Sequence, residues 1–233
     1  MDIAYYFGFL LLGYLLGSIP FGLIIVKLGT GKDVRKVESG RTGGTNAYRA
    51  AGIWAGVLTG LLDGLKGAVA VWLTAGLSYW LAGSPIWMVC AGLGSILGHN
   101  YSIFLAERNE NGQWRLRGGA GGATAAGGAI GLWWPSVFFL VPGALLTLYF
   151  SGYASVATLS IPLMALVLFA VRAYLGYGPW AYVLYGVLAE VVLLWALRPN
   201  LKRLMNGTER MVGPRAKRRG AKAAAENGQS GES

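Results

Sequence analysis

Three polar stretches carry the side chains in this sequence that could do chemistry. The first is ESGRTGGTNAYRAAG, residues 38–52. Its glycines let the backbone approach a ligand closely, successive N–H groups can form an anion-binding nest, and arginine fits phosphate oxygens. The stretch indicates an anion site with Arg49, and with Ser39, Thr45 and Asn46 as neutral hydrogen-bond partners. Glycine turns and arginines also occur in inert loops, so that second interpretation stays open.

The second stretch, residues 98–128, holds His99, the only histidine in the chain. One histidine without neighbouring cysteines or carboxylates predicts no metal site. It is suited to acid–base work or to a structural hydrogen bond that fixes the loop, and both remain open. The run RGGAGGAT within this stretch offers exposed backbone N–H groups before a helix start, which favours phosphate. The following small residues, GGATAAGG, equally suit close helix packing in a membrane.

The third stretch is RPNLKRLMNGTER, residues 198–210. Its polar residues are expected on one face; they are Asn200, Lys202, Arg203, Gly207, Thr208 and Glu209.

An ionisable pair lies inside an apolar run, in the motif LLDGLKG. Asp63 and Lys66 are three residues apart, so on a helix they share a face and can pair. Charged groups within a membrane segment are costly and face the interior of a bundle. The pair has two interpretations, a buried structural contact between helices or a support behind the polar site. Glu190 is another interior candidate.

The elements that must position these residues are membrane helices. The chain is 55% hydrophobic and 13% charged, against about 25% charged in soluble domains, and a helix needs about 20 apolar residues to cross a bilayer. The expected spans are 3–27, 52–82, 85–105, 119–134, 136–151, 154–175 and 179–197. Spans four and five could instead form one long element kinked around Pro135, since proline bends helices.

Basic residues predict the orientation. The stretch from Lys27 to Arg49 holds six Lys and Arg residues, residues 106–118 hold three, and the chain from Arg198 onward holds nine. Cytoplasmic loops are enriched in these residues, so all three polar stretches are expected on the cytoplasmic side. The basic charge is then a topology signal, and no nucleic-acid partner is expected.

The predicted fold is an all-α integral membrane protein, a compact bundle of about seven transmembrane helices with the N-terminus outside and the C-terminus cytoplasmic. An odd number of crossings follows from this orientation, which leaves five or seven spans. Residues 1–213 are expected to form a single polytopic membrane domain. Residues 214–233 are expected to form a basic, disordered cytoplasmic tail.

Five motifs in order, spread over residues 10–213, resemble those of a known family. They are GSIPFGLIIVK, ESGRTGGTNAYRAAG, DGLKG, GHNYSIF and NLKRLMNGTE. Together they resemble the signatures of the bacterial acyl-phosphate:glycerol-3-phosphate acyltransferases of the inner membrane. The resemblance implies acyl transfer from acyl phosphate to the 1-hydroxyl of glycerol 3-phosphate, giving lysophosphatidic acid and phosphate. It implies no cofactor, membrane lipids as surroundings, and a multi-pass protein of the bacterial cytoplasmic membrane with its active site on the cytoplasmic face. Contact with other enzymes of phospholipid synthesis stays open.

The resemblance also implies roles for individual residues. Residues expected to act on the substrates are Ser39, Arg49, Asn200, Glu209 and, as a candidate, His99. Residues expected to bind substrate or shape the binding loops are Thr45, Asn46, Gly118, Gly119, Gly121, Gly207 and Arg117. Asp63 and Lys66 are expected to support the site from behind.

The sequence departs from the family pattern at several positions. Ala120 stands where the family has a lysine that is expected to hold phosphate, and Arg115 or Arg117 could supply the missing charge. Leu197 stands where the family often has histidine, and GRTGG differs from the family loop, which more often has asparagine at the position of Arg41. These departures keep two alternatives open: a non-catalytic paralogue that binds lipid precursors or a partner enzyme, and a small transporter whose path is lined by intramembrane charges.

Overall fold

The computed structural model describes residues 2–81, 83–213 and 215–216. The predicted tail, 214–233, therefore lies outside the described residues except at positions 215–216. In chain order the elements are α1 (Asp2–Gly17), α2 (Phe21–Thr30), η1 (Val34–Lys36), α3 (Gly44–Ala51), α4 (Ile53–Trp80), α5 (Pro85–Asn100), β1 (Ser102–Arg108), β2 (Trp114–Arg117), α6 (Gly122–Leu132), η2 (Trp134–Ser136), α7 (Val137–Ser151), α8 (Ala154–Tyr174) and α9 (Ala181–Met205).

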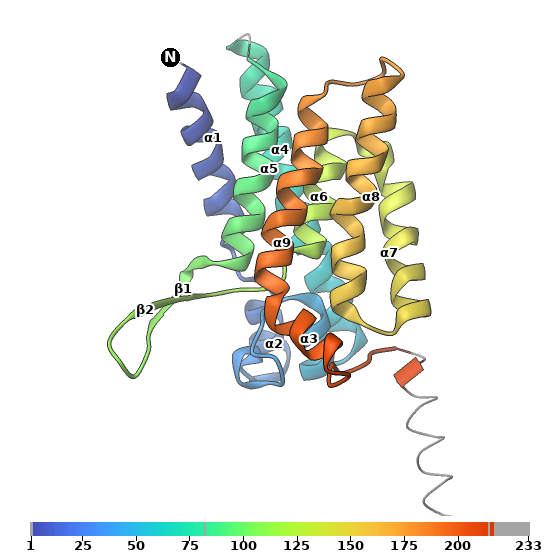
Figure 1. Cartoon of the computed structure of the whole chain (residues 1–233). Helices are drawn as coiled ribbons and strands as arrows, with labels where there is room; N and C mark the ends of the chain where they lie inside the picture. The colour runs from blue at the N-terminus through green and yellow to red at the C-terminus, as the bar shows by residue number, and fades with distance from the viewer. Residues whose placement is uncertain (1, 82, 214, 217–233) are drawn as a thin grey trace, which may run out of the picture.

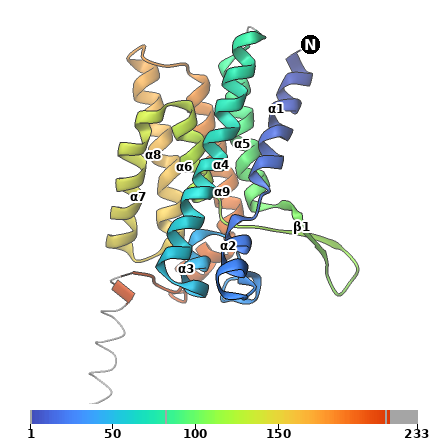
Figure 2. The same cartoon turned by 180° about the vertical axis from the view of Figure 1, so that it is seen from behind.

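The long helices stand side by side along one axis, while α2, α3 and the β1–β2 hairpin gather at one end (Figures 1 and 2). We call this end the polar end. The start of α1 lies at the opposite end, and the last turns of α9 lie at the polar end (Figure 1). All three polar stretches therefore converge at one end of the bundle, as the charge pattern predicts.

Small residues hold the centre of the bundle together. A Cβ added to Gly127 of α6 would lie 1.8 Å from the Gly64 carbonyl oxygen of α4, so only glycine allows this approach. The Tyr185 hydroxyl of α9 donates to the Ala125 carbonyl of α6 at 2.7 Å. The small-residue run GGATAAGG thus serves helix packing, as one of its two interpretations proposed.

The helix boundaries differ from the expected spans at several points; α9, for example, continues to Met205 instead of ending at residue 197. The first span is interrupted, because α1 ends at Gly17 and α2 begins only at Phe21, after Pro20, which lacks a backbone N–H. The helix of the third expected span, α5, ends at Asn100 rather than at residue 105, since residues 102–108 form β1. An Asn-Gly pair at the hairpin turn, with Gly112 at φ 74°, favours this hairpin.

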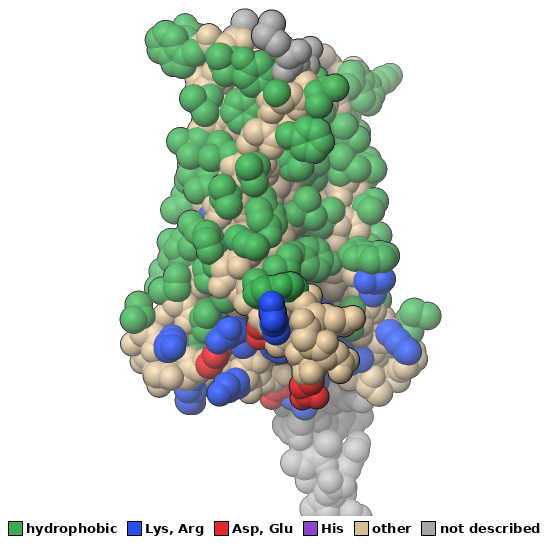
Figure 3. All heavy atoms as spheres, turned by 90° about the vertical axis from the view of Figure 1, so that its left-hand side faces the viewer, with side chains coloured by type: hydrophobic (Ala, Val, Ile, Leu, Met, Phe, Trp, Pro, Cys, Tyr) green, Lys and Arg blue, Asp and Glu red, His purple; other side chains and the backbone are tan. Residues whose placement is uncertain are grey.

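Among the described residues, five helical segments are long and apolar enough to cross a membrane: Ile3–Thr30, Ile53–Trp80, Trp134–Ser151, Ala154–Tyr174 and Ala181–Met205. The helices α6 and α7 are separate, joined through η2, so the single kinked element is not formed. The surface agrees with a bilayer position: apolar side chains cover the body, and charged ones gather at the polar end (Figure 3). The exact number of crossings and the orientation stay predictions.

Candidate active site

The loop before α3 is held in place by Asn46. Its buried side-chain nitrogen lies 2.8–3.0 Å from the carbonyl oxygens of Val34, Val37 and Arg41. A buried amide that spans three backbone carbonyls acts as a brace for the loop. Asn46 therefore shapes the site from inside the loop, whereas its neighbour Thr45 is exposed.

A polar cavity of about 790 Å³ opens at the polar end. It lies between the loop before α3, the end of the hairpin and the last turns of α9. Its wall is rich in arginine, and the arginines that line it are Arg41, Arg49, Arg115, Arg117, Arg203 and Arg210. The carboxylates on the same wall are Glu38 and Glu209. The excess of cations suits an anionic ligand.

A second cavity of about 320 Å³ adjoins the first and runs between α7 and α8, where its wall becomes apolar. We call it the apolar groove; its apolar lining includes Ala144, Leu145, Leu148, Ala157 and Ile161. The two cavities share a set of residues that we call the junction residues: Ser39, Arg41, Arg49, Asn200, Glu209 and Arg210. A cationic polar cavity and an apolar groove thus meet at one point.

Glu209 organises the C-terminal side of the junction. Its two carboxylate oxygens accept hydrogen bonds from Asn200 Nδ2 at 3.0 Å and from Ser155 Oγ at 2.8 Å. Asn200 lies on α9 and Ser155 on α8, so the carboxylate ties two helices together. The sequence motifs single out Asn200 and Glu209 but not Ser155, which follows a tight turn with no distinguishing pattern.

The two arginines Arg41 and Arg49 line both cavities. Arg41 Nη2 donates to the Ala196 carbonyl of α9 at 2.7 Å. Burial lowers the pKa of both guanidinium groups, but arginine stays protonated in proteins at neutral pH. The sequence motifs predict Arg49 as a site residue. They do not predict Arg41, which differs from the residue that the family more often has there.

A compact charged cluster lies deeper in the bundle, where Asp63 and His99 form part of the wall of the groove. Lys66 Nζ lies 2.7 Å from Asp63 Oδ1 and donates to the Ile19 carbonyl at 2.8 Å. His99 Nδ1 lies 3.4 Å from the same Asp63 oxygen. The predicted contact between Asp63 and Lys66 is confirmed, and the structure adds His99 to it. We call these three residues the Asp63 cluster.

The second nitrogen of His99 faces the glycine loop. A Cβ on Gly119 would lie 1.9 Å from His99 Nε2, so a larger residue here would require the buried imidazole to move. The Gly119 N–H donates to the His99 carbonyl at 2.9 Å, so it is used within the protein to hold the glycine loop. His99 also lines the groove. Its placement is compatible with both interpretations, the structural bond and a role at the site.

The other predicted glycines differ in position. Gly118 lines the polar cavity, where its carbonyl accepts from Thr42 N at 3.2 Å. Gly121 lines the groove at the start of α6, with a φ of 87° that favours glycine. Gly207 follows α9 with a φ of 68° and is exposed outside the lining of both cavities. Its place indicates a turn residue.

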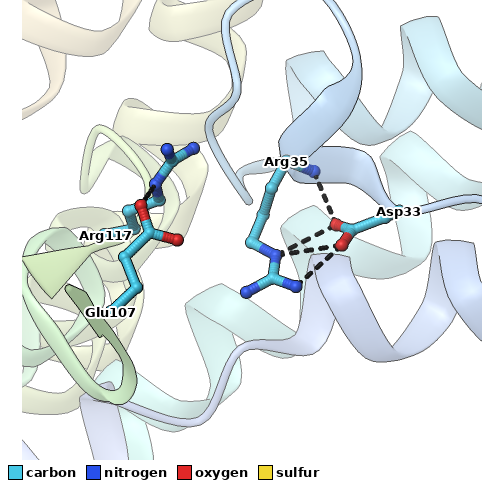
Figure 4. Close-up of polar contacts among 4 residues, drawn as sticks. All are labelled: Asp33, Arg35, Glu107 and Arg117. Atoms are coloured by element: carbon cyan, nitrogen blue, oxygen red, sulfur yellow. Dashed lines mark hydrogen bonds and ion pairs between the residues drawn. The ribbon is translucent and has the colours of Figure 1, made fainter. Parts of the chain in front are cut away.

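The hairpin contributes Arg115 and Arg117 to the wall of the polar cavity. Arg117 Nε pairs with Glu107 on the facing strand, while Arg35 and Asp33 form a separate ion pair in the neighbouring loop (Figure 4). Part of the charge of Arg117 is therefore compensated within the hairpin.

The fold and the site together define a class: an integral membrane protein whose cationic cavity opens onto an apolar groove, which suits phosphate-bearing amphiphiles. A family model described as glycerol-3-phosphate acyltransferase matches residues 7–207. The glycerol-3-phosphate acyltransferase of Bradyrhizobium sp. (strain BTAi1) is 38% identical over 88% of this chain and 93% of its own length. That of Thermus thermophilus is 36% identical over 90% of this chain and 96% of its own length.

Two crystal structures of PlsY, an integral membrane glycerol 3-phosphate acyltransferase, share the fold. The glycerol 3-phosphate form is 32% identical, with a TM-score of 0.74 over 89% of this chain and 96% of that one. The lysophosphatidic acid form is 30% identical, with a TM-score of 0.72 over 89% and 95%. The chain belongs to the glycerol-3-phosphate acyltransferase family. The resemblance carried by the five motifs is thereby confirmed.

Proposed function

We propose that this protein transfers an acyl group from acyl phosphate to the 1-hydroxyl of glycerol 3-phosphate, giving lysophosphatidic acid and inorganic phosphate. One observation carries the proposal: the arginine-rich cavity and the apolar groove share the junction residues. A reaction between a small phosphate ester and an acyl phosphate needs both environments at one point. The related PlsY structures are the glycerol 3-phosphate form and the lysophosphatidic acid form, which are the acceptor and the product of this reaction.

The chemistry requires positioning more than a strong nucleophile. The hydroxyl oxygen of glycerol 3-phosphate bonds to the acyl carbon, and the bond between that carbon and the phosphate oxygen breaks. The electron pair leaves with phosphate, which also takes up the hydroxyl proton. Because acyl phosphate is already activated, holding the two substrates together supplies much of the rate. Fixed cationic donors then stabilise the charge that develops on the leaving phosphate.

The junction residues supply these donors. Arg49, from α3, faces both cavities and is assigned to phosphate together with Ser39. Asn200 and Glu209, fixed to each other at 3.0 Å, are assigned to orienting the acceptor. With the polar end on the cytoplasmic side, the acceptor enters from the cytoplasm and the acyl chain from the bilayer through the groove.

The test is a phosphate-release assay on the full chain purified in detergent, with glycerol 3-phosphate and palmitoyl phosphate, and with palmitoyl-CoA as the donor control. We expect release with palmitoyl phosphate only. Arg49→Ala should abolish it. The matched control is Arg172→Ala, which should retain phosphate release. Arg172 lies in the last turn of α8, away from the polar end, and donates a hydrogen bond to the Tyr177 carbonyl. No release by folded wild type, beside an active relative, would overturn the proposal and favour the non-catalytic alternative.

A further inference from the structure

Arg41 is a firmly held cation at the junction. Its backbone is fixed at both sides, because its carbonyl accepts from Asn46 Nδ2 at 2.8 Å and the next residue, Thr42, donates to the Gly118 carbonyl at 3.2 Å. Its side chain reaches α9, where Nη2 donates to Ala196 O at 2.7 Å. The guanidinium group is therefore held in one place.

The second terminal nitrogen of Arg41 is unsatisfied. Within the part of the chain that the structure describes, Arg41 Nη1 is buried and has no hydrogen-bond partner. A buried charged nitrogen without a partner is costly, and such a group in a native structure needs an explanation, for which a bound anion is one candidate. Arg41 lines both cavities, so a ligand at the junction lies within reach of its guanidinium group.

The neighbouring charges require the ligand to be an anion. Arg203 lines the same cavity and lies close enough to destabilise the protonated form of Arg41. Glu209 is the nearby carboxylate and offsets part of this repulsion, but its two oxygens accept hydrogen bonds from Asn200 and Ser155. Among the described residues no carboxylate forms an ion pair with Arg41. The junction thus holds a fixed positive charge that a ligand must balance.

We propose that Arg41 binds the phosphate group of the acyl donor at the junction. This inference rests on the proposed function. The apolar lining of the groove suits the acyl chain, which places its phosphate where the groove meets the polar cavity. Of the junction arginines, Arg210 is 72% exposed and pairs with Glu38, which leaves Arg41 and Arg49. Arg41 is anchored on α9, and its unsatisfied nitrogen stabilises the phosphate as it leaves.

The assignment also accounts for Ala120. This residue lines the same groove as Arg41 and brings no charge, where the resembling family has a lysine. Conversely, Arg41 stands where that family more often has an uncharged asparagine. A lysine at position 120 would place a cation on the wall of the groove that Arg41 also lines, and the double variant below tests whether it replaces the charge of Arg41.

The test uses Arg41→Gln, Arg41→Lys and the double variant Arg41→Gln/Ala120→Lys. Arg35→Gln is the matched control, because Arg35 belongs to the same loop but pairs with Asp33 outside both cavities. Phosphate release is measured against palmitoyl phosphate and against glycerol 3-phosphate. We expect Arg41→Gln to lower kcat/KM for palmitoyl phosphate by roughly 100-fold, the loss typical of one fixed donor, with the KM for glycerol 3-phosphate within about twofold. Arg41→Lys and the double variant should recover part of the rate.

A binding measurement keeps the inference separate from turnover. Hexadecyl phosphate should raise the melting temperature of wild type and of Arg35→Gln, and should fail to raise that of Arg41→Gln. Wild type that binds hexadecyl phosphate through Arg41 but releases no phosphate would overturn the proposed function and keep this inference. The assignment of Arg41 would be overturned if hexadecyl phosphate stabilised wild type and Arg41→Gln equally. It would also be overturned if Arg41→Gln raised only the KM for glycerol 3-phosphate.

Discussion

The Asp63 cluster and the junction residues are both polar groups in an apolar bundle, yet they differ in how their charges are balanced. In the Asp63 cluster the three side chains are at most 5% exposed, and the carboxylate lies within 3.4 Å of both partners. At the junction, arginines outnumber carboxylates and face open cavities. Buried charges persist when they are paired, and the carboxylate of the first group has cationic partners within the group, whereas the second group has an excess of cations.

This difference distinguishes a structural role from a binding role. Asp63 and Lys66 hold α4 to the break between α1 and α2, through the Lys66 bond to Ile19. They stabilise the frame behind the groove. The junction has an excess of positive charge, which the proposed function assigns to a substrate phosphate. The predictions below test this division, beginning with the largest effect.

Asp63→Ala should be the most destabilising change. It leaves the Lys66 ammonium group buried without a carboxylate, and breaking a buried pair costs about 3–5 kcal/mol. The measurement is thermal or denaturant unfolding in detergent. The double variant Asp63→Ala/Lys66→Met removes both charges and should recover most of the loss. A double variant no more stable than Asp63→Ala would contradict the claim that the loss comes from the unpaired charge of Lys66.

Glu209→Ala should cost less, since it removes hydrogen bonds rather than a buried counter-charge. It leaves Asn200 and Ser155 without their shared acceptor, and hydrogen bonds to charged groups contribute about 1.5–3 kcal/mol. Unfolding in detergent measures the loss. Ser155→Ala, which removes one of the two bonds, should show a smaller loss; an equal or larger loss would contradict the role given to the carboxylate.

Gly119→Ala tests the contact between the two groups, because Gly119 lines the polar cavity and packs against His99. Its Cβ would meet His99 Nε2 at 1.9 Å, and such overpacking costs about 1–3 kcal/mol. Both stability and phosphate release should fall. Gly8→Ala, in α1 with nothing within 4 Å of the added Cβ, is the control and should leave stability unchanged or slightly higher.

The Asp33–Arg35 ion pair lies outside both groups and shows how little a partly exposed ion pair contributes to stability. Its hydrogen bonds to Arg35 lower the pKa of the Asp33 carboxyl from 3.8 to about 2. A depressed carboxyl pKa stabilises the fold above pH 4, and the contribution is lost as the pH falls towards 2. Because the pair is partly exposed, its contribution is only about 0.2–1 kcal/mol.

Asp33→Asn should therefore flatten the dependence of stability on pH between about 4 and 2, with little change near neutral pH. Unfolding in detergent at several pH values measures it. A loss at neutral pH as large as that of Asp63→Ala would show that burial does not separate the two kinds of contact.

Much of the site follows from the sequence because its cues are local. Hydrophobic runs predict the helices, basic loops place the three polar stretches at one end, and a spacing of three residues pairs Asp63 with Lys66. Arg49, Ser39, Asn200 and Glu209 do line a common cavity. In contrast, the sequence pattern misses the end of α5 and the hairpin, although an Asn-Gly turn signal is present.

The remaining features depend on contacts that only the tertiary structure creates. Arg41 meets Ala196 across 155 positions of the sequence, and Ser155 meets Glu209 across 54. No periodicity encodes which carbonyl a distant arginine reaches or which of its nitrogens stays unsatisfied. The sequence by itself thus determined the helices, the polar end and the paired charges, because neighbours along a helix decide them. The packing of α9 against the loop before α3 determined the position of the Arg41 guanidinium group at the junction.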